Sequence, residues 1–128
     1  MTDSTMQLPE GITDARKLMT SAKVSFDRSV DSELVLGLAS HFAEWKYGTR
    51  LEYEGGGKVI AMNGGDGRQI RVGTYGIPSG RMYGGSVIME AADEDYLFMG
   101  SDQDIWIHRH ERVGGDGALD RYLEHITS

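Results

Sequence analysis

Apolar residues recur at two different spacings along this chain, and each spacing predicts a different kind of element. Within Ser32–Tyr47, Leu34, Leu38, Phe42 and Trp45 follow one another at intervals of four, four and three residues. This spacing places the four side chains on one face of a helix. The pattern therefore predicts a helix over this range, with its apolar face toward a core.

The residues at both ends of this range favour helix termini. Asp31 can cap the N-terminus with its carboxylate, and Glu33 lies in the first turn, where the helix dipole favours a negative charge. Lys46 lies in the last turn, and Gly48 suits the left-handed conformation that often ends a helix.

Two shorter helices are expected on either side. One runs from about Ile12 to Ala22, although the next residues, Lys23–Asp27, alternate as a strand does. The other covers Gly117–Ile126, where apolar residues return at intervals of three and four. Residues 1–11 are expected to form a flexible polar leader ahead of a single domain over 12–128.

Between the long helix and the last one, the apolar pattern has period two and glycine-rich turns separate the segments. The connections are too short for crossover helices, so antiparallel pairing is expected. The chain therefore predicts an α+β fold with an N-terminal helix or helices, a five- to six-stranded antiparallel meander sheet and a short C-terminal helix. The expected strands are Arg50–Glu54, Lys58–Met62, Arg68–Ile77, Ser86–Ala91, Tyr96–Met99 and Ile105–Val113.

Composition narrows the classes of function. The formal net charge of −7 disfavours a nucleic acid partner, because such binding normally uses a basic patch. The chain has no cysteine, which excludes disulfides, thiolate metal sites and cysteine nucleophiles. No apolar run approaches the ~20 residues of a membrane-spanning helix, and no signal peptide is indicated. A cytoplasmic protein without membrane contact is expected.

The segment Ile105–Val113 places two of the four histidines two residues apart in an expected strand. Alternate side chains of a strand share a face, which groups Trp106, His108, His110 and Arg112. Two imidazoles at this spacing can bind one divalent metal ion if another element supplies a third ligand. His108 and His110 are therefore candidate metal ligands and candidate catalytic residues.

Three interpretations of this pair stay open. In a metal site, His41, His125 or a carboxylate of an acidic loop would be the third ligand, since Glu111 faces the other way. Without metal, the pair can act as acid and base or bind an anion. The simplest interpretation is that both histidines are polar residues of an exposed sheet face. Apart from a divalent metal, no cofactor is indicated.

Two acidic clusters flank the expected strand Tyr96–Met99, and Asp93, Asp95, Asp102 and Asp104 are their aspartates. At ~3.3 Å per residue, the strand keeps the clusters on the order of 17 Å apart, so they cannot share one ion. Aspartate is common in turns, which is one explanation for both clusters. The functional interpretation is an acidic rim for a basic partner.

Arg71 and Tyr75 form a further candidate binding patch because they share strand parity. Arginine offers bidentate donors to an anion, and tyrosine offers a ring for stacking. The alternative is that both are ordinary surface residues.

The features together favour a small cytoplasmic binding or interaction protein: an inhibitor, an adaptor or a small-ligand binding module. It would use a sheet face containing Trp106 and Arg112, and the acidic rim, to bind a protein partner or small ligand. A homo-oligomer is expected, since one sheet face lacks a helix to cover it. The alternative is an enzyme centred on His108 and His110, either metal-dependent or a metal-free acid/base phosphodiesterase.

Overall fold

The computed structural model describes residues 8–48, 53–55, 58–59, 62–63, 69–75, 86–90, 94–111 and 117–127, and the side chains of 8–48, 86–90, 95–109 and 117–127. Its elements in chain order are β1 (Ile12–Leu18), β2 (Ser21–Phe26), α1 (Ser32–Tyr47), β3 (Tyr53–Gly55), β4 (Lys58–Val59), β5 (Met62–Asn63), β6 (Gln69–Tyr75), β7 (Ser86–Glu90), β8 (Glu94–Ser101), β9 (Asp104–Glu111) and α2 (Ala118–Thr127).

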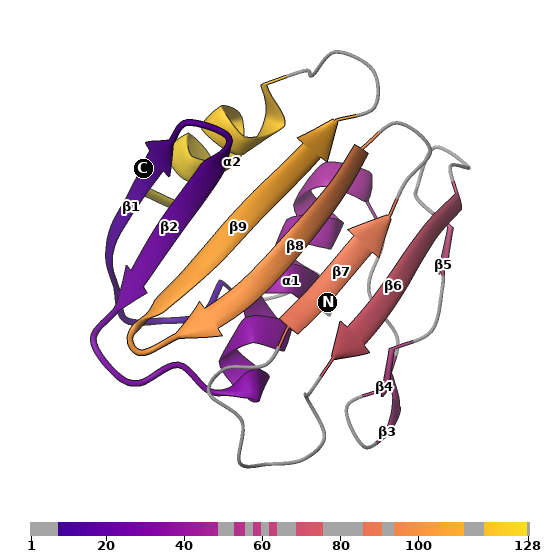
Figure 1. The fold of residues 1–128 in the computed structure, drawn as a ribbon. Helices are drawn as coiled ribbons and strands as arrows, with labels where there is room; N and C mark the ends of the chain where they lie inside the picture. The colour runs from indigo at the N-terminus through magenta and orange to yellow at the C-terminus, as the bar shows by residue number, and fades with distance from the viewer. Residues whose placement is uncertain are drawn as a thin grey trace, which may run out of the picture.

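An antiparallel sheet forms one layer of the fold, with its strands in the order β1-β2-β9-β8-β7-β6-β5 (Figure 1). The predicted α+β class and antiparallel pairing are confirmed. The meander is confirmed from β5 to β9, and the β1–β2 hairpin, which was not expected, pairs with β9. The predicted first hairpin corresponds to β3 and β4, which form a separate two-stranded sheet. The main sheet therefore differs from the expected one, because it includes β1 and β2 and excludes β3 and β4.

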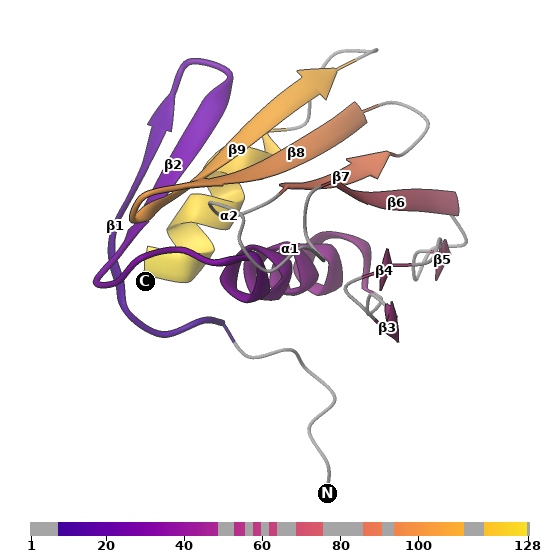
Figure 2. The same cartoon turned by 60° about the horizontal axis from the view of Figure 1, so that its bottom comes forward.

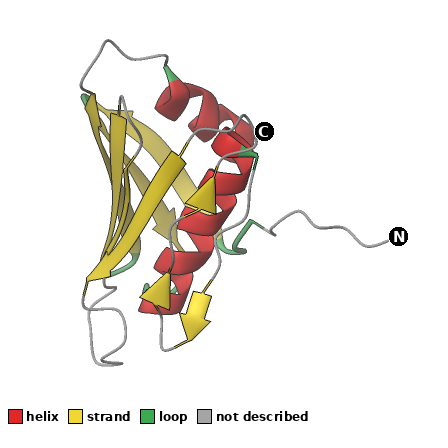
Figure 3. Cartoon of the chain, turned by 90° about the vertical axis from the view of Figure 1, so that its right-hand side faces the viewer, coloured by secondary structure: helices red, strands yellow, loops and turns green. Residues whose placement is uncertain are grey.

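Both helices lie on the same side of this sheet (Figures 2 and 3). Helix α1 contacts β7 and β8, and α2 contacts β1 and β2. No element of the described residues covers the other side, which we call the open face. The side chains that alternate toward the open face are Asp14, Arg16 and Leu18 on β1, Ser21, Lys23 and Ser25 on β2, Asp104, Trp106 and His108 on β9, Asp95, Leu97 and Met99 on β8, and Ser86, Ile88 and Glu90 on β7.

Helix α1 has the bounds that the apolar spacing predicts. The Asp31 carboxylate accepts a hydrogen bond of 2.8 Å from the backbone N–H of Leu34, which confirms the predicted N-cap. At the other end, Gly48 has a φ of 70° and its N–H donates to the carbonyl of Glu44. A left-handed residue at this position ends the helix as expected, because glycine adopts positive φ without strain.

The predicted helix over Ile12–Ala22 is wrong, because these residues form β1, a turn and the start of β2. The chain reverses at Met19, whose φ of 58° lies in the left-handed region. Strand β2 then buries every second side chain, with Ala22, Val24 and Phe26 each at most 3% exposed. Burial of this period-two face outweighs the weak helical spacing of the segment.

The short C-terminal helix is confirmed as α2. Its buried side chains are Ala118, Leu119, Tyr122, Leu123 and Ile126, which form one face toward the sheet and α1. Neither helix is long and apolar enough to cross a membrane, among the residues that the structure describes.

Phe42 lies at the centre of the core, on the side of α1 that meets the sheet. Its side chain is fully buried. Its ring centroid lies 4.6 Å from that of Tyr96 and 5.5 Å from that of Phe98, both on β8, and 4.9 Å from that of Tyr122 on α2. Aromatic pairs at such distances add attraction beyond the burial of apolar area. One side chain therefore connects the sheet to both helices.

We expect Phe42→Ala to lower the free energy of unfolding by about 3 to 5 kcal/mol, because truncation leaves a cavity that the surrounding rings cannot fill. Urea denaturation followed by circular dichroism measures this loss. The control is Leu18→Ala on β1, whose side chain is 40% exposed and whose truncation should cost at most about 0.5 kcal/mol. Equal losses in the two variants would contradict the central position of Phe42.

Candidate functional site

The candidate site on β9 has one buried and one open side. Ile105 and Ile107 are fully buried, as the alternation along this strand predicts. Trp106 and His108 are half-buried on the open face. Their rings are nearly parallel, with an interplanar angle of 9° and centroids 6.3 Å apart. Strand β9 therefore presents a stacked indole and imidazole on a surface that no described element covers.

Strand β2 supplies two contacts to this pair that the sequence did not predict. Ser21 is the backbone partner of His108, and its Oγ lies 2.7 Å from the imidazole Nδ1, within a hydrogen bond. Lys23 is the partner of Trp106, and its Nζ lies 5.7 Å from the ring centroid, a cation–π distance. These contacts hold the two rings against the sheet.

His41 and His125, two of the groups considered as a third ligand, do not lie beside His108, whereas the third alternative, a carboxylate of an acidic loop, stays a prediction. Both histidines lie on the helix layer, on the other side of the sheet from His108. They face each other, with ring centroids 5.8 Å apart and an interplanar angle of 20°. The sheet therefore separates the histidines of the helices from those of β9.

The metal hypothesis for His108 and His110 stays a prediction. The side chain of His110 and the whole of Arg112 lie outside the described residues. Within the described part of the chain, no group of three or more His, Asp or Glu side chains could hold a metal ion. A complete metal site would therefore need the side chain of His110 or others that the structure does not describe.

A shallow hollow of about 270 Å³ lies beside His108 on the open face. Ile88 and Leu97 provide its apolar lining, and Glu90 and Asp95 provide carboxylates. Tyr96 and Arg109 complete the lining together with His108. The hollow therefore combines an apolar surface with acidic groups at one end of the open face.

The predicted acidic rim is divided between the two ends of β8. Asp95 lies near the start of β8, and Asp102 follows its end, in the turn to β9. There Asp102 has a φ of 54°, and the Asp104 carboxylate accepts a 2.7 Å hydrogen bond from the hydroxyl of Ser25. Asp93 lies outside the described residues. The two ends are too far apart to act as one site, as the length of the strand predicts.

Arg71 and Tyr75 lie on β6, and only their backbone positions are described. Arg71 is the register partner of Glu90, and Tyr75 is the register partner of Ser86. This register places Arg71 next to the acidic end of the open face. The anion patch proposed for Arg71 and Tyr75 stays a prediction.

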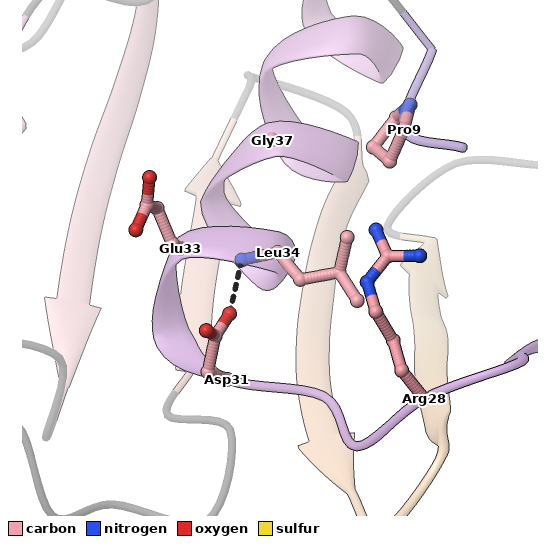
Figure 4. A pocket seen from close by; sticks show the side chains of 6 residues that line it. All are labelled: Pro9, Arg28, Asp31, Glu33, Leu34 and Gly37. Atoms are coloured by element: carbon pink, nitrogen blue, oxygen red, sulfur yellow. Dashed lines mark hydrogen bonds between the residues drawn. The ribbon is translucent and has the colours of Figure 1, made fainter. Parts of the chain in front are cut away.

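Two further hollows lie on the helix side. One, of about 340 Å³, lies at the N-terminal end of α1 (Figure 4). Its lining includes Arg28, whose Nη1 donates 2.7 Å and 3.1 Å hydrogen bonds to the carbonyl of Glu10 and the carboxylate of Asp27. These bonds tie the residues before β1 to the segment before α1.

The other hollow, of about 300 Å³, lies between the two helices and is lined by His41, Glu44, Trp45 and His125. His41 is 8% exposed, and its Nδ1 lies 3.0 Å from the hydroxyl of Tyr122. Burial lowers the pKa of His41 below its ordinary value of 6.5; the charge of His125 lowers it further, and Glu44 opposes the shift. Burial also raises the pKa of Tyr122, so its hydroxyl stays neutral.

No protein-family model matches this chain, and neither the curated proteins nor the solved structures that were searched include a similar one.

We expect His41 to make the fold less stable as the pH falls below 6.5, its ordinary pKa. The unfolded chain binds a proton at that pKa, whereas the folded chain resists protonation until a lower pH. The free energy of unfolding therefore decreases from about pH 6.5 down to the lowered pKa of folded His41. Urea denaturation over a pH series measures this decrease, which should be smaller in His41→Gln.

The pKa of His41 can also be followed directly by NMR. In His125→Gln one source of the lowered pKa is removed, so the pKa of His41 should rise toward its ordinary value. A pKa of 6.5 or above in the wild-type protein would contradict this account of the histidine pair.

Proposed function

We propose that this chain is a binding protein that holds a protein partner against its open face. The observation that carries the proposal is an apolar surface that the helices leave uncovered. Trp106 is the register partner of Met99, and Leu97 is the partner of Ile88, so the four side chains adjoin one another across β7, β8 and β9. Met99 remains 39% exposed. Contiguous apolar surface of this kind is typical of protein interaction sites.

The charges of the open face favour a partner with basic residues around an apolar patch. Its described carboxylates are Asp14, Glu90, Asp95 and Asp104, against the cationic groups of Arg16 and Lys23. Arg71 adds one base at the register position beside Glu90. The acidic side chains lie at the two ends of the apolar centre, so they would meet the rim of a partner. Such complementarity accelerates association and excludes wrong partners.

The hollow beside His108 suits one long basic side chain of that partner. Ile88 and Leu97 would contact its aliphatic stem, while Glu90 and Asp95 lie where its charged head would end. An arginine could donate to both carboxylates at once. Trp106 lies on β9, two residues before His108, next to the hollow. It would be the central aromatic contact with the partner, since tryptophan is a common hot-spot residue.

We expect Trp106→Ala to weaken partner binding by about tenfold or more, since a central hot-spot side chain contributes ~2 kcal/mol or more. We expect Asp95→Lys also to weaken binding, because it sets a like charge against the basic side chain in the hollow. Proteins from an extract of the source cells are retained on immobilised wild-type and variant chains and compared by quantitative mass spectrometry. The supporting result is a set of proteins that both variants lose together. Its binding should also weaken with added salt, because surface charges are screened.

The matched control is Glu124→Lys, which makes the same change of charge at an exposed position of α2, on the helix side. It should retain the whole set. If the open-face variants and the control capture the same proteins, the open face is not the binding surface.

A second candidate function is the enzyme centred on His108 and His110. One contact favours it: a hydroxyl within 2.7 Å of an imidazole, as Ser21 and His108 provide, is the arrangement that activates a nucleophile. In the metal-dependent version, His108 Nε2 and His110 would bind the ion. Metal analysis of protein purified without a tag should then find about one zinc, iron or manganese per chain. The metal-dependent version fails if no metal is found, and the metal-free version fails if Ser21→Ala and His108→Ala keep whatever phosphodiesterase activity the wild type has.

A further inference from the structure

The two edges of the sheet differ in their capacity to pair with another strand. Strand β5, at one edge, has two residues, whereas β1, at the other, has seven (Figure 1). Within the described residues, β1 pairs with β2 alone. A long edge strand presents a row of N–H and C=O groups that can template another strand. The edge at β1 is therefore a surface that a further strand could extend.

We propose that two copies of this chain form a symmetric dimer by antiparallel pairing of their β1 strands, centred on Ala15. In this register Asp14 of each copy lies opposite Arg16 of the other. Directly opposite residues of an antiparallel pair point to the same side with Cβ atoms about 4.5 to 5.5 Å apart. The contact therefore contains two ion pairs related by the two-fold axis.

The single chain already holds these charges in position. Arg16 Nε lies 2.7 Å from Asp14 Oδ2, and their side chains are 59% and 41% exposed. Because the pair lies next to the open edge rather than in the core, both groups are accessible to a second strand. Each carboxylate could then bind the guanidinium of its own chain and that of the other.

Other registers of the same two strands are disfavoured by charge. Centring the pair on Asp14 sets two carboxylates opposite each other, and centring it on Arg16 sets two guanidinium groups opposite each other, which destabilises the pairing. A shift by one residue would put the two helix layers on opposite sides of the joined sheet. In the register centred on Ala15, Lys17 reaches the bulge at Thr13, so no like charges meet.

Charges on an edge strand commonly prevent such pairing, because a second copy would be repelled. Here the order acid, alanine, base is self-complementary, so the charges favour a second copy and select its register. The bulge between Ile12 and Asp14 ends the regular part of β1 and limits the paired segment. Helix α2 leaves room at this end, since a hollow of about 480 Å³ lies between Ile12–Ala15 and residues Ile126 and Thr127.

Sedimentation equilibrium over a hundredfold range of concentration tests the proposal. We expect the wild-type chain to change from monomer to dimer within this range, because a contact through one strand is small and falls in the weak class. Asp14→Arg and Arg16→Asp each create two like-charge pairs, so each should raise the dissociation constant by about tenfold or more. The double variant Asp14→Arg/Arg16→Asp restores both opposite pairs and should dimerise as the wild type does.

The control is Glu33→Arg, which makes the same change of charge as Asp14→Arg at an exposed position of α1 and should leave dimerisation unchanged, because α1 contacts β7 and β8 rather than β1. Circular dichroism of every variant establishes that it is folded. A wild-type chain that stays monomeric overturns the proposal, as does a dimer that both single variants leave intact. A double variant as monomeric as the single variants also overturns it, since the opposite charges would then not act across the two-fold axis.

Discussion

The fold depends on the packing of Phe42 between α1 and the sheet. This ring contacts aromatic side chains of β8 and α2 at once, so it fixes the distance between the two layers. Once two helices occupy one side of the sheet, alternate side chains of each strand meet different surroundings. Tyr96 and Phe98 are fully buried, whereas Leu97 between them is not. Among the described residues, the open face is therefore the side of the sheet that neither helix covers.

Local patterns predicted those parts of the fold that local chemistry determines. Helix α1 followed from its apolar spacing, its Asp31 cap and Gly48, each of which acts within one turn of the helix. The β1–β2 hairpin was missed because its turn contains no glycine. Met19 adopts the left-handed conformation instead, and methionine, unlike asparagine or aspartate, is not a residue that marks such a position in a sequence.

In the candidate site, too, the sequence predicted features within one strand but not contacts between residues far apart in the chain. Strand parity correctly predicted that Ile105 and Ile107 are buried, because parity is a property of one strand. It could not predict that Ser21 binds His108, since 87 residues separate the two and only the strand order joins them. The same limitation kept His41 among the possible third ligands, although its hydrogen-bond partner is Tyr122 of the helix layer, 81 residues away in the chain. Placing a histidine on the correct side of a sheet required the tertiary fold.

The proposed dimer and the proposed binding surface are compatible because of the symmetry of strand pairing. A two-fold axis that joins two β1 strands in one sheet is perpendicular to that sheet, so both helix layers lie on one side and both open faces on the other. The joined sheet would then present two Trp106-centred surfaces in the same direction. A partner with two matching patches could bind both, and the second contact would form at a high effective concentration. Because the β1 contact is small, binding of such a partner would also stabilise the dimer, which couples assembly to recognition.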